Sequence, residues 1–337
     1  MKKTLSISVA SYNIEKYLDR LMDSIISADV FEDVEIIIVN DGSTDSTLDL
    51  AKKYETVYPG FVRVIDKENG GHGSTINTGI RVAEGKYFRA LDGDDWLDSN
   101  NLKRFVLDLK DTDADLIVNS FYWCYEADGT QKEEKPDFPE SGHKYQFIDI
   151  CKDVSWLRYH MITYKTELLK ENPPQLDEHC FYVDLEYVTL PIIHISDVIY
   201  FDYSVYCYRI GYSEQSVSPA SRIKHVDDSY KVAKRIIAFY KENTGLDDRL
   251  KDYIRISLRN ICQWHLVTLV EQPYSRIHKK EVAEFYRLYY EVDPSIVELM
   301  VRNAPGKNWR FLFKNPVRNY VGFKIVAVLE RILHYKN

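Results

Sequence analysis

The sequence predicts an α/β fold, in which a mostly parallel sheet carries helices on both faces, followed by a C-terminal helical region. Two observations favour it. Short apolar runs alternate with segments of helical periodicity over about the first 120 residues, and long helical periods begin near residue 221. The 337 residues, 45% of them hydrophobic, suffice for a substantial core. The five cysteines form no C-x-x-C pair, which favours a reducing compartment over a disulfide framework or a zinc site.

Strands and helices alternate in order along the N-terminal half. Predicted strands cover 5–10, 34–39, 61–65, 87–91, 116–121 and 198–208, and predicted helices cover 14–26, 43–54, 74–83, 102–109 and 182–193. Residues 126–147 are polar and contain prolines, which predicts a long loop or a hairpin. Further helices are expected over 222–242, 247–271, 277–291 and 294–303. These segments predict domains at 1–218, 219–304 and 305–337.

The charge of the chain is unevenly distributed. The net charge of −8 makes nucleic acid an unfavourable partner. Residues 301–337 contain eight Lys or Arg and one Glu, which leaves −15 on the first 300 residues. A helix over 316–335 would carry an apolar stripe beside these basic residues, formed by Val317, Val321, Ile325, Val328 and Ile332. Such a tail suits an anionic membrane surface, reached through 306–337, or packing on the acidic body or across a homo-oligomer interface.

No apolar run reaches 18 residues, and the short, polar-interrupted N-terminal run is a poor signal peptide. A cytoplasmic protein is therefore expected, with peripheral attachment at the inner face of the plasma membrane as the membrane-bound alternative.

Three carboxylates within four residues follow the strand predicted at 87–91. Asp92 and Asp94 are two positions apart in an extended segment, so their side chains point the same way and could share one cation. Oxygen ligands of this kind suit Mg²⁺ or Mn²⁺. The alternative is a solvated acidic turn before the next helix.

The polar loops Ser11-Tyr12-Asn13 and Asn40-Asp41-Gly42 end at the same predicted sheet edge. Asn40-Asp41-Gly42-Ser43 could accept hydrogen bonds from a base or a ribose, or could serve as a strand-to-helix turn. The glycine-containing stretch over 69–79 fits neither a P-loop nor the G-x-G-x-x-G fingerprint.

Taken together and in this order, these segments resemble family 2 glycosyltransferases of the GT-A (Rossmann-like) fold. The match runs through Ser8–Leu18, Val39–Asp45, Asn69–Gly79 and Gly85–Asp95, covers about the first 120 residues well and reaches about residue 218 more weakly. Ile76 stands where many relatives have Arg. The resemblance implies a nucleotide-sugar site in residues 1–218, with a metal at Asp94 and donor contacts from Ala10, Tyr12, Asp41, Asn77, Asp92, Asp95 and Arg209.

The resemblance also places the catalytic base in the segment Asp177–Tyr187. Asp184 aligns with the base, although Val183 replaces the family's Glu before it. Glu186 and Asp177 are alternative bases, and a helix-capping acid is the structural alternative. His72 could contact phosphate or sugar, or be an ordinary loop histidine. Trp156, Tyr159 and His160 could stack on an acceptor sugar or belong to the core.

The resulting expectation is an inverting, Mn²⁺- or Mg²⁺-dependent glycosyltransferase. It would use a nucleoside diphosphate sugar, a UDP-sugar in the favoured case, and a hydroxyl of a surface glycan, a lipid-linked sugar or a glycoprotein. Two alternatives are a sugar-nucleotide pyrophosphorylase and a non-catalytic glycan- or membrane-binding scaffold on the same fold.

Overall fold

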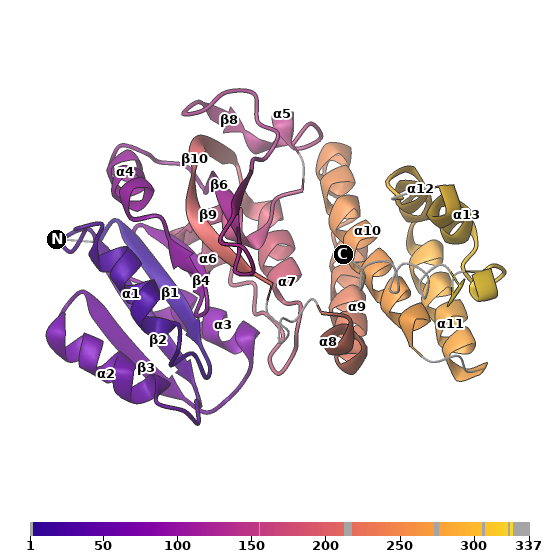
Figure 1. Cartoon of the computed structure of the whole chain (residues 1–337). Helices are drawn as coiled ribbons and strands as arrows, with labels where there is room; N and C mark the ends of the chain where they lie inside the picture. Colours follow the sequence, from indigo (N-terminus) through magenta and orange to yellow (C-terminus); the bar gives the residue numbers. More distant parts are fainter. Residues whose placement is uncertain are drawn as a thin grey trace. The chain divides into compact units, whose positions relative to one another are not determined.

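A mixed sheet lies at the centre of the N-terminal part of the chain (Figure 1). The computed structural model describes residues 3–154, 156–211, 218–272, 276–304, 307–322 and 324–325, which form two units, 1–212 and 213–337. Within the described residues the sheet has ten strands, and the main path runs β3-β2-β1-β4-β9-β6-β10-β5. The strands are β1 (Leu5–Ser11), β2 (Val34–Asp41), β3 (Val62–Lys67), β4 (Tyr87–Asp92), β5 (Trp96–Leu97), β6 (Leu116–Tyr125), β7 (Gln131–Glu134), β8 (Lys144–Gln146), β9 (Ile162–Lys165) and β10 (Asp197–Ile210).

The pairing of the strands confirms the expected parallel half of the sheet and adds an antiparallel half. Strands β3, β2, β1 and β4 are parallel to one another, as are β6 and β10. Strand β9 was not predicted; it lies antiparallel between β4 and β6. It is only four residues long, and so short a run gives little periodicity to detect. The predicted hairpin region contains β7 and β8, which pair with β6 and β10.

Helices connect the strands of this unit, and every β2 residue is buried, as expected for a strand covered on both faces. They are α1 (Leu18–Ile26), α2 (Thr47–Val57), α3 (His72–Val82), α4 (Ser99–Lys110), α5 (Phe147–Ile150), α6 (Thr166–Glu171) and α7 (Asp184–Thr189), with short 3₁₀ turns η1 (Tyr159–Met161) and η2 (Leu190–His194). The prediction that the first helix starts at Ile14 was wrong. Asn13 has a φ of 53°, and the Ile14 amide donates to Thr47 Oγ1 at 2.8 Å, so the helix begins later.

The second unit is helical throughout its described elements. These are α8 (Pro219–Lys224), α9 (Val226–Glu242), α10 (Asp248–Glu271), α11 (Arg276–Val292), α12 (Ser295–Arg302) and α13 (Lys307–Lys314), with α10 packed against α8, α9, α11 and α12. The helix predicted over 222–242 is two helices, because the backbone leaves helical geometry at His225. Between α9 and α10, the buried His265 places Nδ1 2.7 Å from Oγ of Ser229.

The basic tail is described as far as residue 325. Its apolar side chains divide into a buried set, Trp309, Leu312, Phe313 and Tyr320, and an exposed set, Phe311, Val321 and Ile325. Val328 and Ile332, which complete the predicted apolar stripe, lie outside the described residues. Within the described parts of the chain, no helix has the length and hydrophobicity needed to cross a membrane.

Candidate active site

The loop after β4 lies directly against the end of β1. Ala10 pairs with Asp92 in the β1–β4 register. A Cβ on Gly93 would lie 2.6 Å from the Ala10 carbonyl oxygen, so only glycine permits this approach. Ala10 is half-buried and Tyr12, two residues on, is exposed. Both residues predicted to line the nucleoside pocket therefore lie at the carboxyl edge of the sheet, where ligands bind in α/β folds.

His72, at the start of α3, lies against the first carboxylate of this loop. Its Nε2 is 2.9 Å from Oδ1 of Asp92. Burial opposes the protonated form of His72, but the carboxylates of Asp92, Asp184 and Asp94 outweigh it and raise the pKa of the imidazole. Burial likewise opposes ionisation of Asp92, but the charge of His72 and its hydrogen bond lower the pKa of Asp92. Both shifts favour an ion pair between His72 and Asp92, and the loop histidine belongs to the site.

Asp184, which is distant in the sequence, also lies near His72 and Asp92. It is the first residue of α7 and is half-buried. Burial raises the pKa of its carboxyl, His72 opposes the rise and Asp92 adds to it. A carboxylate with a raised pKa accepts protons more readily than an ordinary surface aspartate, as a general base must.

Asp95 is buried beneath the loop and is fixed by β10. Tyr206 Oη donates to Oδ2 at 2.6 Å, and the Arg209 amide donates to Oδ1 at 2.8 Å. Burial, together with the neighbouring Asp94 and Asp92, holds the pKa of Asp95 well above its usual range. Carboxylates this close are mutually destabilising unless a positive charge is present.

Sequence reasoning named His160 only as a stacking or core residue, and the structure places it beside these carboxylates. One ligand atom each from Asp92, Asp95 and His160 lie within 4.8 Å of one another, which would allow them to hold a divalent cation. Asp94, the predicted ligand, is adjacent in sequence but is outside this group of three. The contribution of His160 could not be seen in the sequence, because it depends on how η1 packs on β6 and β10. Tyr159 is buried in the same aromatic cluster.

Asp41, predicted to contact the base, is buried and hydrogen-bonded to its own chain. Its carboxylate accepts from the amides of Gly70 and Gly71 at 2.9 and 2.7 Å, and from Lys67 Nζ at 2.8 Å. In this arrangement Asp41 fixes the glycine loop that precedes α3. A contact with a base stays a prediction.

Asn77, predicted to contact the donor, holds the base-bearing segment on α3. Its Nδ2 donates to the Leu176 carbonyl, and its Oδ1 accepts from the Leu176 amide, both at 2.9 Å. Glu186, an alternative base, is fully buried, and its Oε2 accepts from the Asp177 amide at 2.9 Å. A Cβ on Gly73 would lie 2.2 Å from the Asp177 carbonyl oxygen, so α3 and this segment are in close contact.

Arg209, a predicted diphosphate contact, is buried on the opposite face of β10 from His160. Its guanidinium lies over the Tyr17 ring, 3.8 Å from the centroid, and Nη1 is 3.2 Å from Glu126. Tyr206 and Tyr208 contact His160, so strand alternation directs Cys207 and Arg209 to the other face.

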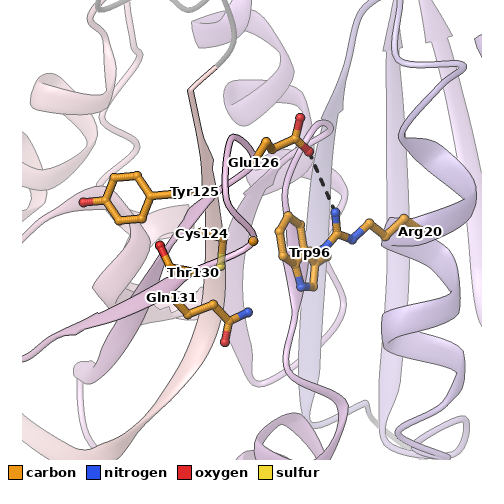
Figure 2. Close-up of a pocket in the computed structure, with 8 residues that line it drawn as sticks. Arg20, Trp96, Cys124, Tyr125, Glu126, Thr130 and Gln131 are labelled. Carbon is orange, nitrogen blue, oxygen red and sulfur yellow. Dashed lines mark ion pairs between the residues drawn. The ribbon is translucent and has the colours of Figure 1, made fainter. Parts of the chain in front are cut away.

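A pocket of about 380 Å³ lies beside Glu126, the ion-pair partner of Arg209. Figure 2 shows the side chains that line it. Arg20 covers the Trp96 ring at 3.3 Å from its centroid and pairs with Glu126 at 3.9 Å. The remaining lining comes from Cys124, Tyr125, Gly129, Thr130 and Gln131. Asp92, Asp184 and His160 do not line this pocket, so the carboxylate group is a separate site.

Comparison with known proteins identifies the class. The described sheet and helices match the GT-A glycosyltransferase fold: a solved structure of Staphylococcus aureus TarS residues 1–349, in complex with UDP-GlcNAc, superposes with a TM-score of 0.66 at 18% identity, covering 97% of this chain and 92% of that one. The fold is thus that of the GT-A glycosyltransferases. Residues 6–172 match the sequence model of "Glycosyl transferase family 2", and through them the chain belongs to that family.

Two curated relatives agree with this assignment. The uncharacterized glycosyltransferase EpsJ of Bacillus subtilis is 26% identical over 324 residues, which is 91% of this chain and 89% of EpsJ. The glycosyltransferase GlyA of Streptococcus pneumoniae is 31% identical over 125 residues, 37% of this chain but only 18% of GlyA. The family match favours a glycosyltransferase over the pyrophosphorylase and the non-catalytic scaffold that the sequence left open.

Proposed function

We propose that this glycosyltransferase moves one sugar, with inversion, from a nucleoside diphosphate sugar to a hydroxyl of a surface glycan, a lipid-linked sugar or a glycoprotein. One observation carries the proposal: carboxylates from the β4 loop and from the start of α7 converge on His72, although they are far apart in the sequence. A UDP-sugar is the favoured donor, because a protein of the same fold is solved with UDP-GlcNAc.

In the proposed reaction Asp184 takes the proton of the acceptor hydroxyl. The acceptor oxygen then bonds to C1 of the donor sugar while the bond from C1 to the diphosphate oxygen breaks, its electron pair leaving with the nucleoside diphosphate. Attack from the face opposite the leaving group inverts the configuration at C1. The Asp92–Asp95 loop would hold Mn²⁺ or Mg²⁺, which when bound offsets the negative charge growing on the departing diphosphate.

The test is a screen of nucleotide sugars with Mn²⁺ or Mg²⁺ and candidate acceptors, followed by identification of the nucleotide released. Release of the nucleoside diphosphate, with loss of about 100- to 10,000-fold of the rate in Asp184→Asn, is the expected result. Glu171→Gln, an exposed acid on α6, is the matched control. Full activity in Asp184→Asn would remove Asp184 from the base role, and release of pyrophosphate or of no nucleotide would refute the proposed transfer.

For location, we infer peripheral attachment to an anionic membrane surface through the basic tail. Phe311, Val321 and Ile325 are 63%, 59% and 55% exposed, and Arg310, Lys314 and Arg318 are exposed in the same segment. Apolar side chains among basic ones bind anionic lipid surfaces.

Co-sedimentation of the full chain with vesicles that contain phosphatidylserine tests this inference. Binding should weaken with salt, and serine at the three exposed apolar positions should abolish it, whereas Leu107→Ser, an equally exposed apolar side chain on α4, should not. Equal sedimentation of the triple variant and the wild type would refute it; self-association lost in the triple variant, without vesicle binding, would point to an oligomer interface.

A further inference from the structure

The imidazole of His160 is held rigidly beside two carboxylates. The ring stacks between Phe121 and Tyr208, with centroid distances of 5.0 and 4.1 Å and interplanar angles of 27° and 28°. Nη2 of the buried Arg89 donates to the His160 carbonyl oxygen at 2.5 Å, which fixes the backbone of the same residue. Because its ring and backbone are already fixed, the His160 side chain would lose little conformational freedom on binding a metal ion or another partner.

Packing alone does not account for the nitrogen atoms of His160. Nδ1 is buried, and no described residue forms a hydrogen bond with it. An imidazole nitrogen that carries no proton offers a lone pair, which is the group that binds a metal ion.

The spacing of the three side chains suits one cation. Metal–ligand bonds of about 2.0–2.2 Å place two ligands of the same ion at most about 4.4 Å apart. The ligand atoms of Asp92, Asp95 and His160 lie within 4.8 Å of one another, so small movements of these side chains would bring all three onto one ion. Both Asp95 oxygens are oriented by β10, which supplies the support that metal ligands require.

We propose that His160 is a direct ligand of the cation, and that Asp92, Asp95 and His160 form a mixed nitrogen–oxygen site that prefers Mn²⁺ or Co²⁺ to Mg²⁺. The proposal rests on the proposed function, which requires only that the Asp92–Asp95 loop holds a cation. Mg²⁺ favours a shell of oxygens and water, whereas imidazole nitrogen favours later first-row metals. His160 therefore sets which metal the site takes.

The direct test is pulsed electron paramagnetic resonance of Mn²⁺ bound to the 337-residue chain in the presence of UDP. Nitrogen hyperfine coupling to Mn²⁺ is expected in the wild type, because imidazole nitrogen is bonded to the metal. His160→Phe keeps an aromatic ring in the stack and should abolish the coupling. His72→Asn, which removes the other imidazole of the site, and His194→Gln, an exposed histidine, should both retain it.

A competition experiment measures the consequence for metal choice. In His160→Phe the affinity for Co²⁺ relative to Mg²⁺ should fall by about tenfold or more, as for loss of one coordinating group. Should His160→Phe fail to fold, His160→Gln replaces it, and coupling that survives in His72→Asn, His179→Gln and His194→Gln but disappears in His160→Gln belongs to His160.

Two results would overturn the proposal while leaving the proposed function intact: Mn²⁺ that binds without nitrogen coupling, and coupling that persists in His160→Phe but disappears in His72→Asn. A wild-type protein that binds no Mn²⁺ with UDP would refute this site and the metal dependence of the proposed function together.

Discussion

Each unit of the molecule contains a histidine whose pKa burial lowers to about 3, and the two are used differently: His265 is buried, whereas His160 is half-buried. In the helical unit, His265 Nδ1 lies 2.7 Å from Ser229 Oγ, so the packing of α9 on α10 satisfies the ring. In the α/β unit, His160 Nδ1 has no hydrogen-bond partner among the described residues, and two carboxylates lie beside the ring. A pKa lowered by burial is common to both, so only the partners separate a structural histidine from one available to a ligand.

The largest effect on stability is expected for Arg89, the buried residue of the α/β unit that holds the backbone of His160. Arg89 is fully buried and donates to Asn119, Thr163 and the His160 carbonyl. Arg89→Met leaves these acceptors unpaired and should lower the free energy of unfolding by about 3–5 kcal/mol. Urea denaturation measures it, with Arg104→Met, an exposed arginine of the same unit, as control. A loss below about 1 kcal/mol would show that the acceptors find other donors.

The comparison can be tested by leaving Nδ1 of His265 without a hydrogen-bond partner, as Nδ1 of His160 is among the described residues. Ser229→Ala removes the hydroxyl beside Nδ1, and a buried nitrogen without a partner costs about 1–3 kcal/mol. Differential scanning calorimetry should show a lower midpoint for the transition of the helical unit. A midpoint equal to that of the wild type would mean that the hydrogen bond between Ser229 and His265 contributes nothing.

Acidification should lower the folding stability by a smaller amount, through the titration of His265. The pKa of His265 is about 3 in the folded protein and near its ordinary value of 6.5 when unfolded, so between these values the unfolded state binds more protons. Stability should fall as pH drops below about 6.5, by at most about 1.4 kcal/mol per pH unit. Denaturation of the wild type and of His265→Asn at pH 7.5 and 5 should show the smaller loss in the variant. Equal losses of stability in the two proteins would mean that His265 is not the source of the pH dependence.

The smallest stability change is expected for His160→Phe. The ring already stacks on Phe121 and Tyr208 and forms no hydrogen bond through Nδ1, so replacement should change stability by less than about 1 kcal/mol. Thermal unfolding without added metal measures this. Destabilisation as large as that of Ser229→Ala would mean that His160 has a structural role like that of His265.

The sequence predicted the parallel half of the sheet because apolar runs and polar loop ends are local signals. It also identified Asp92, Asp94 and Asp184 as neighbours through the family resemblance, and the structure brings all three near His72. What it could not provide depends on contacts between distant segments. Strand β9 is too short to show a pattern, and the break at His225 lies inside a continuous helical period.

The candidate site shows the same limit. Asp41 and Asn77 carry the residue types expected of ligand contacts, but the structure shows them hydrogen-bonded to neighbouring loops, a use that no spacing in the sequence reveals. His160 was placed with the aromatic residues before the base segment. Its position beside Asp92 arises from stacking between side chains of β6 and β10, which are more than eighty residues apart in the chain.

The dependence of Asp95 on β10 has a consequence for how the protein is made. The Asp92–Asp95 loop is translated early, yet both hydrogen bonds to the Asp95 carboxylate come from Tyr206 and Arg209, and β5 pairs with β10. During synthesis from the N-terminus, a growing chain therefore exposes its acidic loop to solvent or to a chaperone well before β10 is available to orient it. A nascent chain halted before residue 206 would have the sequence of the active site without its geometry, so competence is acquired only when the final strand of the sheet leaves the ribosome.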